Sequence, residues 1–202
     1  MYKCICGHEQ YEILSKDVVE CIKGRFELIH LVVLCSKCNR KRKIIRPLVC
    51  DLTEASTGNI IMGFDGPYSF LSNFYPVQIN MGDFVFPSVE HAYQAGKTDD
   101  PDMRSRIARM SAAGDAKWQG KHLIIIPGFE QNKIEIMGKI LRIKFSNKEF
   151  KEKLLDTGNM LIFEYNMWED VFWGIIQYDS LFYGENYLGR LLMEIRDEIS
   201  KE

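Results

Sequence analysis

All six cysteines of this 202-residue chain lie among its first 50 residues. Cys35 and Cys38 have the two-residue spacing with which a tight turn presents two thiolates to one tetrahedral metal ion, and Cys4 and Cys6 resemble a second, shorter knuckle. These four cysteines predict a structural zinc site. Because the Cys4–Cys6 spacing is short, His8 is the alternative ligand in place of one cysteine.

A second set of candidate residues lies in the segment 88–97. Glu90, Gln94 and Lys97 are spaced at i, i+4 and i+7 and would share one face of a helix. Such a face is often simply solvated. This helix is short, however, and it follows the apolar residues 84–87, so a wholly exposed face would be hard to arrange. Both interpretations, a solvated face and a polar site, stay open at this point.

Two further segments combine polar groups with large rings or glycines. Residues 164–174 hold two tryptophans, three acids and Gly174, a glycine that would let a ligand approach the backbone closely. Acids among aromatic rings often have a raised pKa and can serve as proton donors or bases, although Trp173 and Gly174 could equally be packing residues. Residues 183–189 are glycine-rich and open the last helix, where backbone amides favour anions such as phosphate.

The elements that must position the cysteines form a compact N-terminal module. Apolar strands are predicted at 12–21 and 25–34, with a turn at Lys23-Gly24. A hairpin between two cysteine-bearing turns is typical of a zinc ribbon. About fifty residues bury little apolar surface, so a metal would supply the missing stability.

Beyond this module, the pattern predicts short strands followed by helices. The predicted strands are 73–79 and 83–86, and the predicted helices start at 88, after Asp100, at 131, at 147 and near 188. We therefore expect an α+β fold: a compact, mostly helical domain with a small β-hairpin region, preceded by a small β zinc ribbon. The expected boundaries are 1–50 for the ribbon, 51–60 for a linker and 61–202 for the larger domain.

Composition and charge narrow the class of protein. A hydrophobic fraction of 46% with 12% aromatic residues is typical of a globular chain. The net charge of −2 conceals a basic segment 1–50, with ten Lys/Arg and five Asp/Glu, and an acidic remainder, which excludes a simple polycation. The basic run 39–43 is either a nucleic-acid contact or an ordinary solvated edge. The apolar stretches are too short for a membrane span and there is no apolar leader, so we expect a cytoplasmic protein without a membrane partner.

Five ordered blocks of the sequence resemble the YbiA-like family, also called the NADAR superfamily. The resemblance covers roughly residues 61–200 and is specific because the five blocks occur in order with compatible spacing. The matching blocks are residues 71–76 (LSNFYP), 86–97 (FPSVEHAYQAGK), 156–158 (DTG), 170–174 (DVFWG) and 184–193 (GENYLGRLLM).

The resemblance implies an N-glycosidase, which hydrolyses the bond between a ribose anomeric carbon and an amine or nucleobase nitrogen without a catalytic metal. Some members are similar to enzymes of phosphorylated riboflavin-pathway intermediates, others to hydrolases that remove ADP-ribose from modified nucleobases. The expected partner is therefore a ribose-containing small molecule or an ADP-ribosylated nucleobase. The reaction passes through an oxocarbenium-like ribose, which a carboxylate can stabilise.

The resemblance also suggests roles for individual residues. Glu90 would be the catalytic carboxylate, and Asp170 the second catalytic group, as acid/base or as an anchor for a ribose hydroxyl. The implied substrate-binding residues are Asn73 for the ribose or for positioning Glu90, Lys97 and the backbone near Gly184 to Asn186 for phosphate, Trp173 for stacking, and Gly174.

The sequence departs from the family at residues 127–130, where members often have a basic residue followed by Asp-Trp-Glu. Phe129 would then replace the tryptophan as a stacking surface, or Trp118 would reach over instead. The rival interpretation of the whole chain is a non-catalytic module that binds ADP-ribose or NAD, with a ribbon that docks on nucleic acid. A ribbon-bearing transcription factor is disfavoured because nothing after residue 61 suggests a base-contacting element.

Overall fold

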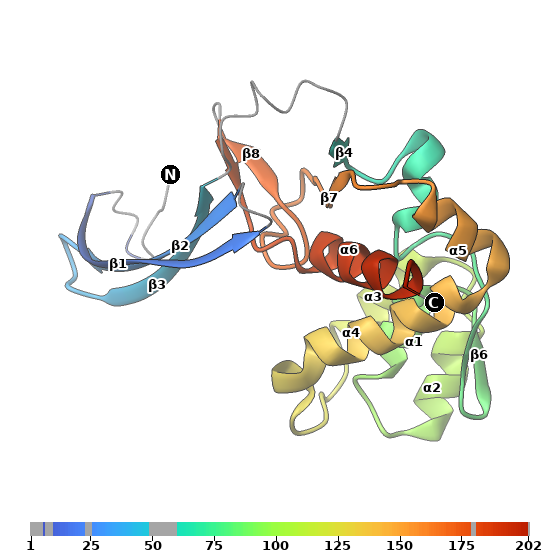
Figure 1. Cartoon of the computed structure of the whole chain (residues 1–202). Coiled ribbons are helices and arrows are strands. Elements are labelled where there is room, and N and C mark those ends of the chain that lie inside the picture. Colours follow the sequence, from blue (N-terminus) through green and yellow to red (C-terminus); the bar gives the residue numbers. More distant parts are fainter. Residues whose placement is uncertain (1–5, 7–9, 23–25, 49–59, 179–180, 202) are drawn as a thin grey trace. The chain divides into compact units, whose positions relative to one another are not determined.

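The structure is a computed structural model of the chain and describes residues 6, 10–22, 26–48, 60–178 and 181–201. It contains two compact units, coloured along the sequence in Figure 1. The ribbon unit comprises residues 1–63 and 161–189, and the helical unit comprises residues 64–160 and 190–202. The larger predicted domain, 61–202, thus contributes to both units, and most of the predicted linker lies outside the described residues.

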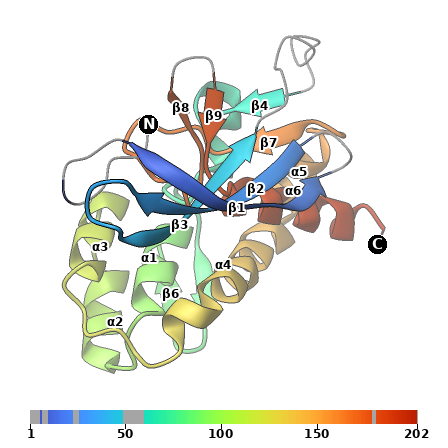
Figure 2. The ribbon, with the colours of Figure 1, turned by 90° about the vertical axis from the view of Figure 1, so that its left-hand side faces the viewer.

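A three-stranded antiparallel sheet forms the N-terminal part of the ribbon unit (Figure 2). β1 (Tyr11–Ile22) pairs with β2 (Phe26–Cys35), as the hairpin prediction required. The sequence did not predict β3 (Lys41–Leu48), which pairs with β2 and contains most of the basic run. Val33, opposite Arg42 in this register, is fully buried.

Short strands make up the remainder of the ribbon unit. β4 (Ile60–Met62) pairs in parallel with β7 (Leu161–Phe163), and β8 (Ile176–Tyr178) pairs with β9 (Leu181–Tyr183) as an antiparallel hairpin. Between β7 and β8, Tyr165 forms a single parallel bridge with Ile175. The loop that joins these two strands holds the predicted residues Asp170, Trp173 and Gly174.

The helical unit begins with a 3-10 helix, Gly66–Leu71, and a hairpin of β5 (Ile79–Met81) and β6 (Phe84–Phe86). The α-helices follow in the order expected, with one addition, α3. They are α1 (Val89–Ala95), α2 (Pro101–Ala108), α3 (Ala113–Gly120), α4 (Phe129–Ser146), α5 (Lys148–Leu155) and α6 (Tyr187–Ile199), of which α6 starts in the ribbon unit. Among the described residues, no helix has both the length and the apolar character needed to cross a bilayer.

Capping residues explain where three of these helices begin. The Ser88 hydroxyl accepts a hydrogen bond from the His91 N–H, and the side chains of Asp100 and Asn147 accept equivalent bonds at the starts of α2 and α5. The predicted strand at 73–79 is wrong except for its last residue. The carbonyl of Asn73 instead accepts the Glu90 N–H at 2.9 Å, so this segment caps α1.

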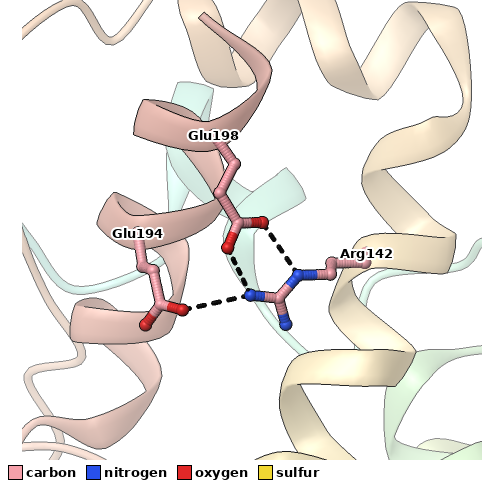
Figure 3. A network of polar contacts seen from close by, with 3 residues as sticks. All are labelled: Arg142, Glu194 and Glu198. Atoms are coloured by element: carbon pink, nitrogen blue, oxygen red, sulfur yellow. Dashed lines mark hydrogen bonds and ion pairs between the residues drawn. The ribbon is translucent and has the colours of Figure 1, made fainter. Parts of the chain in front are cut away.

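Two long helices supply much of the core of the helical unit. Their buried apolar residues recur at helical spacing and include Met137, Ile140, Leu141 and Phe145 of α4 and Leu191, Leu192 and Ile195 of α6. Arg142 of α4 also binds two carboxylates of α6, Glu194 and Glu198 (Figure 3). The bond from Arg142 Nε to Glu198 Oε2 is 2.8 Å long. These side chains are partly exposed, so each ion pair contributes about 1 kcal/mol at most to the free energy of unfolding.

Candidate functional site

Three of the four predicted metal-binding cysteines lie together in the ribbon unit. The Sγ atoms of Cys6, Cys35 and Cys38 all lie within 4.8 Å of one another, and those of Cys6 and Cys35 are 3.6 Å apart. Thiolates bound tetrahedrally to zinc at about 2.3 Å would be roughly 3.8 Å apart, so the cluster fits a metal ion. Cys4 and His8, the candidates for the fourth ligand, lie outside the described residues.

The turn between Cys35 and Cys38 leads into β3. The N–H of Asn39 donates to the carbonyl of Cys35 at 2.9 Å, and Asn39 has a φ of 53°, a conformation that asparagine adopts more easily than most residues. Arg40, Lys41 and Arg42 follow and are exposed. Their contact with nucleic acid stays a prediction.

The polar face of α1 is buried in the helical unit, so the solvated interpretation of this face is wrong. Glu90 is 6% exposed and Gln94 is 4% exposed. The Gln94 Nε2 donates to Glu90 Oε1 at 2.7 Å, while the Glu90 N–H donates to the carbonyl of Asn73. A buried carboxylate is expensive unless it is hydrogen-bonded, and the bond from Gln94 orients this one.

Lys97 lies in the turn after α1 and places a cation close to this carboxylate. Its Nζ lies 5.6 Å from the ring centroid of Tyr93 and 5.9 Å from that of Phe129. Burial lowers the pKa of Lys97, and the negative charge of Glu90 opposes this shift. The structure thus brings together three predicted residues, which with Gln94 we call the Glu90 cluster: Asn73, Glu90, Gln94 and Lys97.

Asn73 offers a further polar atom within this cluster. Its Nδ2 donates to the sulfur of Met137 at 3.6 Å, and its Oδ1 is buried without a hydrogen-bond partner among the residues that the structure describes. Buried acceptors are normally satisfied. A donor on a ligand, such as a sugar hydroxyl, would satisfy this one.

The two candidate stacking residues have different surroundings. Phe129 is buried, and its ring centroid lies 5.4 Å from that of Tyr93. Trp118 is 62% exposed on α3, with its ring 4.2 Å from that of His122. Trp118 lines a surface groove whose lining does not include Glu90, Gln94 or Lys97. The structure therefore does not place Trp118 in the Glu90 cluster.

The position of Gln94 depends on a glycine in α3. A Cβ on Gly120 would lie 1.7 Å from Gln94 Oε1 and 2.5 Å from its Cδ. Since Gln94 is buried and bonded to Glu90, its side chain cannot move away cheaply.

We expect Gly120→Ala to destabilise the fold by about 2 kcal/mol, within the usual cost of overpacking a core, and to lower activity by displacing Gln94. Gly114→Ala in the same helix is the matched control. Its added Cβ would meet nothing within 4 Å, so it should be neutral or stabilising by about 0.5 kcal/mol. Urea unfolding of both variants checks this; equal midpoints would contradict the assigned contact.

In the ribbon unit, the carboxylate of Asp170 caps a turn. Its Oδ1 accepts the N–H groups of Phe172 at 3.1 Å and Trp173 at 2.9 Å. Asn166 holds the same residue from the other side, because its Oδ1 accepts the Asp170 N–H and its Nδ2 donates to the Asp170 carbonyl. One oxygen of Asp170 therefore maintains the loop, and its part in catalysis stays a prediction.

Gly174 and Asn186 serve the packing of the ribbon unit. A Cβ on Gly174 would lie 2.1 Å from the carbonyl oxygen of Glu164, so the group that approaches this glycine is the chain's own backbone rather than a ligand. The side chain of Asn186 accepts the Glu164 N–H at 3.0 Å and donates to the carbonyl of Ile162 at 2.8 Å. The oxygen and the nitrogen of this amide thus each make a hydrogen bond within the fold.

Four backbone amides at the start of α6 are also engaged within the fold, so the predicted phosphate site near Gly184 to Asn186 lacks the N–H groups of Glu185 and Asn186. The N–H groups of Glu185 and Asn186 donate to the carbonyls of Val171 and Gly174 at 2.7 and 3.3 Å. The next two amides donate in the same way, to the carbonyls of Phe172 and Trp173. These donors are therefore not available to an anion. The Trp173 ring packs edge-on against Phe172, with centroids 5.0 Å apart.

Sequence reasoning missed Lys144, a fully buried lysine of α4. Its Nζ donates to the carbonyl of Ser72 at 2.8 Å, directly before Asn73. Three aromatic rings lie 5.4 to 5.9 Å from the same nitrogen, those of Tyr75, Phe145 and Phe150. The helical spacing could have revealed its burial, because Lys144 lies on the same face of the helix as the apolar residues Met137 and Leu141.

Residues 62–200 match the model of the NADAR domain, and comparisons with known proteins identify relatives of this chain. The N-glycosidase YbiA of Escherichia coli (strain K12) is 32% identical over 138 residues, which are 67% of this chain and 84% of that protein. A riboflavin biosynthesis protein of Vibrio vulnificus (strain YJ016) is 34% identical over 146 residues, 68% of this chain but only 37% of that longer protein. The NMR structure of E. coli YbiA matches with a TM-score of 0.62 and 30% identity, covering 71% of this chain and 86% of that one.

Proposed function

The chain belongs to the NADAR domain family, and from this we propose that it is a hydrolase of the N-glycosidic bond between a ribose and an amine or nucleobase nitrogen. The observation that carries the proposal is the buried Glu90 carboxylate, which Gln94 holds at 2.7 Å. Relatives that are named N-glycosidases support the reaction class. The family model covers residues 62–200, which include Glu90 and Asp170.

The Glu90 cluster has the groups that this reaction needs. Departure of the nitrogen leaves positive charge on the ribose, which a buried carboxylate stabilises, or the carboxylate activates the attacking water. In this scheme the Asn73 Oδ1 accepts a ribose hydroxyl, and Lys97 binds a phosphate of the substrate. Asp170, in the ribbon unit, stays the predicted second catalytic residue.

We propose two substrate classes, a phosphorylated riboflavin-pathway intermediate and an ADP-ribosylated nucleobase. The test is to incubate the full chain with a phosphoribosylamino-pyrimidine, with ADP-ribosylated nucleic acid and with NAD, and to follow the products by mass spectrometry. Release of a free amine or base together with the ribose product is the expected result. Tight binding of these compounds without any cleavage would overturn the proposal in favour of the non-catalytic binding module.

We further propose that the cysteine cluster holds one structural zinc ion with Cys4 or His8 as fourth ligand. Three thiols within 4.8 Å of one another support this. Purified protein should contain about one equivalent of zinc, and Cys35→Ser or Cys38→Ser should lose it and destabilise the N-terminal sheet. Plasma emission spectroscopy measures the zinc content. Less than half an equivalent, with thiols that react readily, would contradict the proposal.

A further inference from the structure

A surface groove of about 720 Å³ lies along α2 and α3 in the helical unit. It is a separate feature from the Glu90 cluster, although α1 supports it, because His91 Nε2 lies 3.2 Å from the carbonyl of Met110 on its lining. The residues that line the groove are Asp102, Arg106, Arg109, Met110, Asp115, Trp118 and Gln119.

Trp118 gives the groove an aromatic surface. Exposure of 62% is high for a tryptophan, whose indole usually contributes to a core. The His122 ring packs 4.2 Å from it, and the His122 Nδ1 lies 2.8 Å from the Trp118 carbonyl, so the turn that follows α3 supports the indole. An exposed, supported ring of this kind is a platform on which a nucleobase stacks, at about 1–3 kcal/mol per base.

Charged groups of both signs surround this ring. Arg106 and Arg109 are exposed and form no ion pair with any residue that the structure describes. The guanidinium of Arg109 donates a hydrogen bond to the Ser105 hydroxyl. A guanidinium has the fork geometry that binds phosphate. Asp102 and Asp115 supply acceptors that suit the exocyclic amines of a base. A simple anion would be repelled by these carboxylates, and a purely apolar ligand would leave all four charges without partners.

We propose that this groove binds a nucleotide, with its base stacked on Trp118 and its phosphate held by Arg106 and Arg109. A nucleotide matches the whole lining because it combines a flat ring, amine donors and a phosphate. It comes either from a single-stranded polynucleotide or from a free mononucleotide. The proposal does not require that the chain hydrolyse anything, so it stands or falls separately from the glycosidase.

Two probes distinguish these sources with the full chain: a fluorescently labelled single-stranded hexanucleotide, followed by anisotropy, and AMP, followed by calorimetry. Trp118→Ala should weaken binding of the relevant probe about tenfold, because the stacking energy is lost. Arg106→Gln with Arg109→Gln should weaken it and lower the salt dependence of hexanucleotide binding by roughly 1.4 in log–log slope. The matched control, Lys139→Gln with Lys148→Gln, removes the same charge from α4 and α5 and should change little.

The results with the two probes show which source of nucleotide the groove binds. Tighter binding of the hexanucleotide, sensitive to these variants, identifies a polynucleotide, and variant-sensitive binding of AMP alone identifies a free nucleotide. Because Trp118 and both arginines are exposed, the variants should fold, which thermal unfolding checks. If neither probe binds, or if binding is the same in wild type, Trp118→Ala and the arginine pair, the proposal is wrong.

Discussion

Glu90→Gln is expected to lower kcat/KM at least about a hundredfold on whichever N-riboside the chain cleaves, the lower range for acid–base groups. Glutamine keeps the shape of the side chain, and its amide oxygen can still accept the hydrogen bond from Gln94. The variant therefore removes the negative charge without opening a cavity. Steady-state kinetics with the confirmed substrate measure the loss.

Two further variants test whether a loss of activity comes from a missing negative charge or from a disturbed structure. Glu135→Gln removes the same charge from an exposed ion pair with Lys139 and should keep full activity. Asp170→Asn keeps an oxygen for the N–H groups of Phe172 and Trp173, so a large loss in that variant would reflect its charge rather than its turn. Full turnover by Glu90→Gln, with a normal melting temperature, would show that the carboxylate is not the catalytic group.

Local signals in the sequence account for where three of the six α-helices in the described part of the chain begin. Ser88, Asp100 and Asn147 cap their helices with their own side chains, a property visible in a few neighbouring residues. The sequence does not predict α3 because its N-cap residue, Ala112, has no capping side chain and the helix contains Gly114, so nothing local marks its start. The strand expected over 73–79 failed because a distant N–H, that of Glu90, takes the carbonyl of Asn73.

Only some properties of the candidate-site residues can be predicted from the sequence, because the surroundings of these residues depend on tertiary contacts. Helical spacing correctly placed Glu90 and Gln94 on one face, but periodicity does not reveal whether a polar face is solvated or covered. The sequence predicts a ligand against Gly174, because glycine permits a close approach, and phosphate near Asn186, because the last helix begins there. At both residues the observed partner is the chain's own backbone at Glu164, which only the tertiary structure could show.

Lys144 carries the strongest pH dependence of stability that we expect in the helical unit. Burial lowers its pKa from an ordinary value of 10.5 to about 7, although the carbonyl of Ser72 and three ring faces favour the cation. Below pH 7 the lysine is protonated in both the folded and the unfolded chain, so folding carries the full cost of burying the charge. Between pH 7 and 10.5 the unfolded chain binds more protons, so the free energy of unfolding rises with pH.

Comparison of wild type with Lys144→Met isolates this effect, because the variant has a similar length and cannot titrate. The free energy of unfolding of wild type, relative to Lys144→Met, should rise by about 2–3 kcal/mol from pH 7 to pH 9, at roughly 1.4 kcal/mol per pH unit. Urea unfolding at several pH values measures it. Lys148→Met, which removes an exposed lysine of α5, should give a curve parallel to wild type. If the Lys144→Met curve also ran parallel to wild type, the lysine would titrate alike in both states, and its burial would not be the cause proposed here.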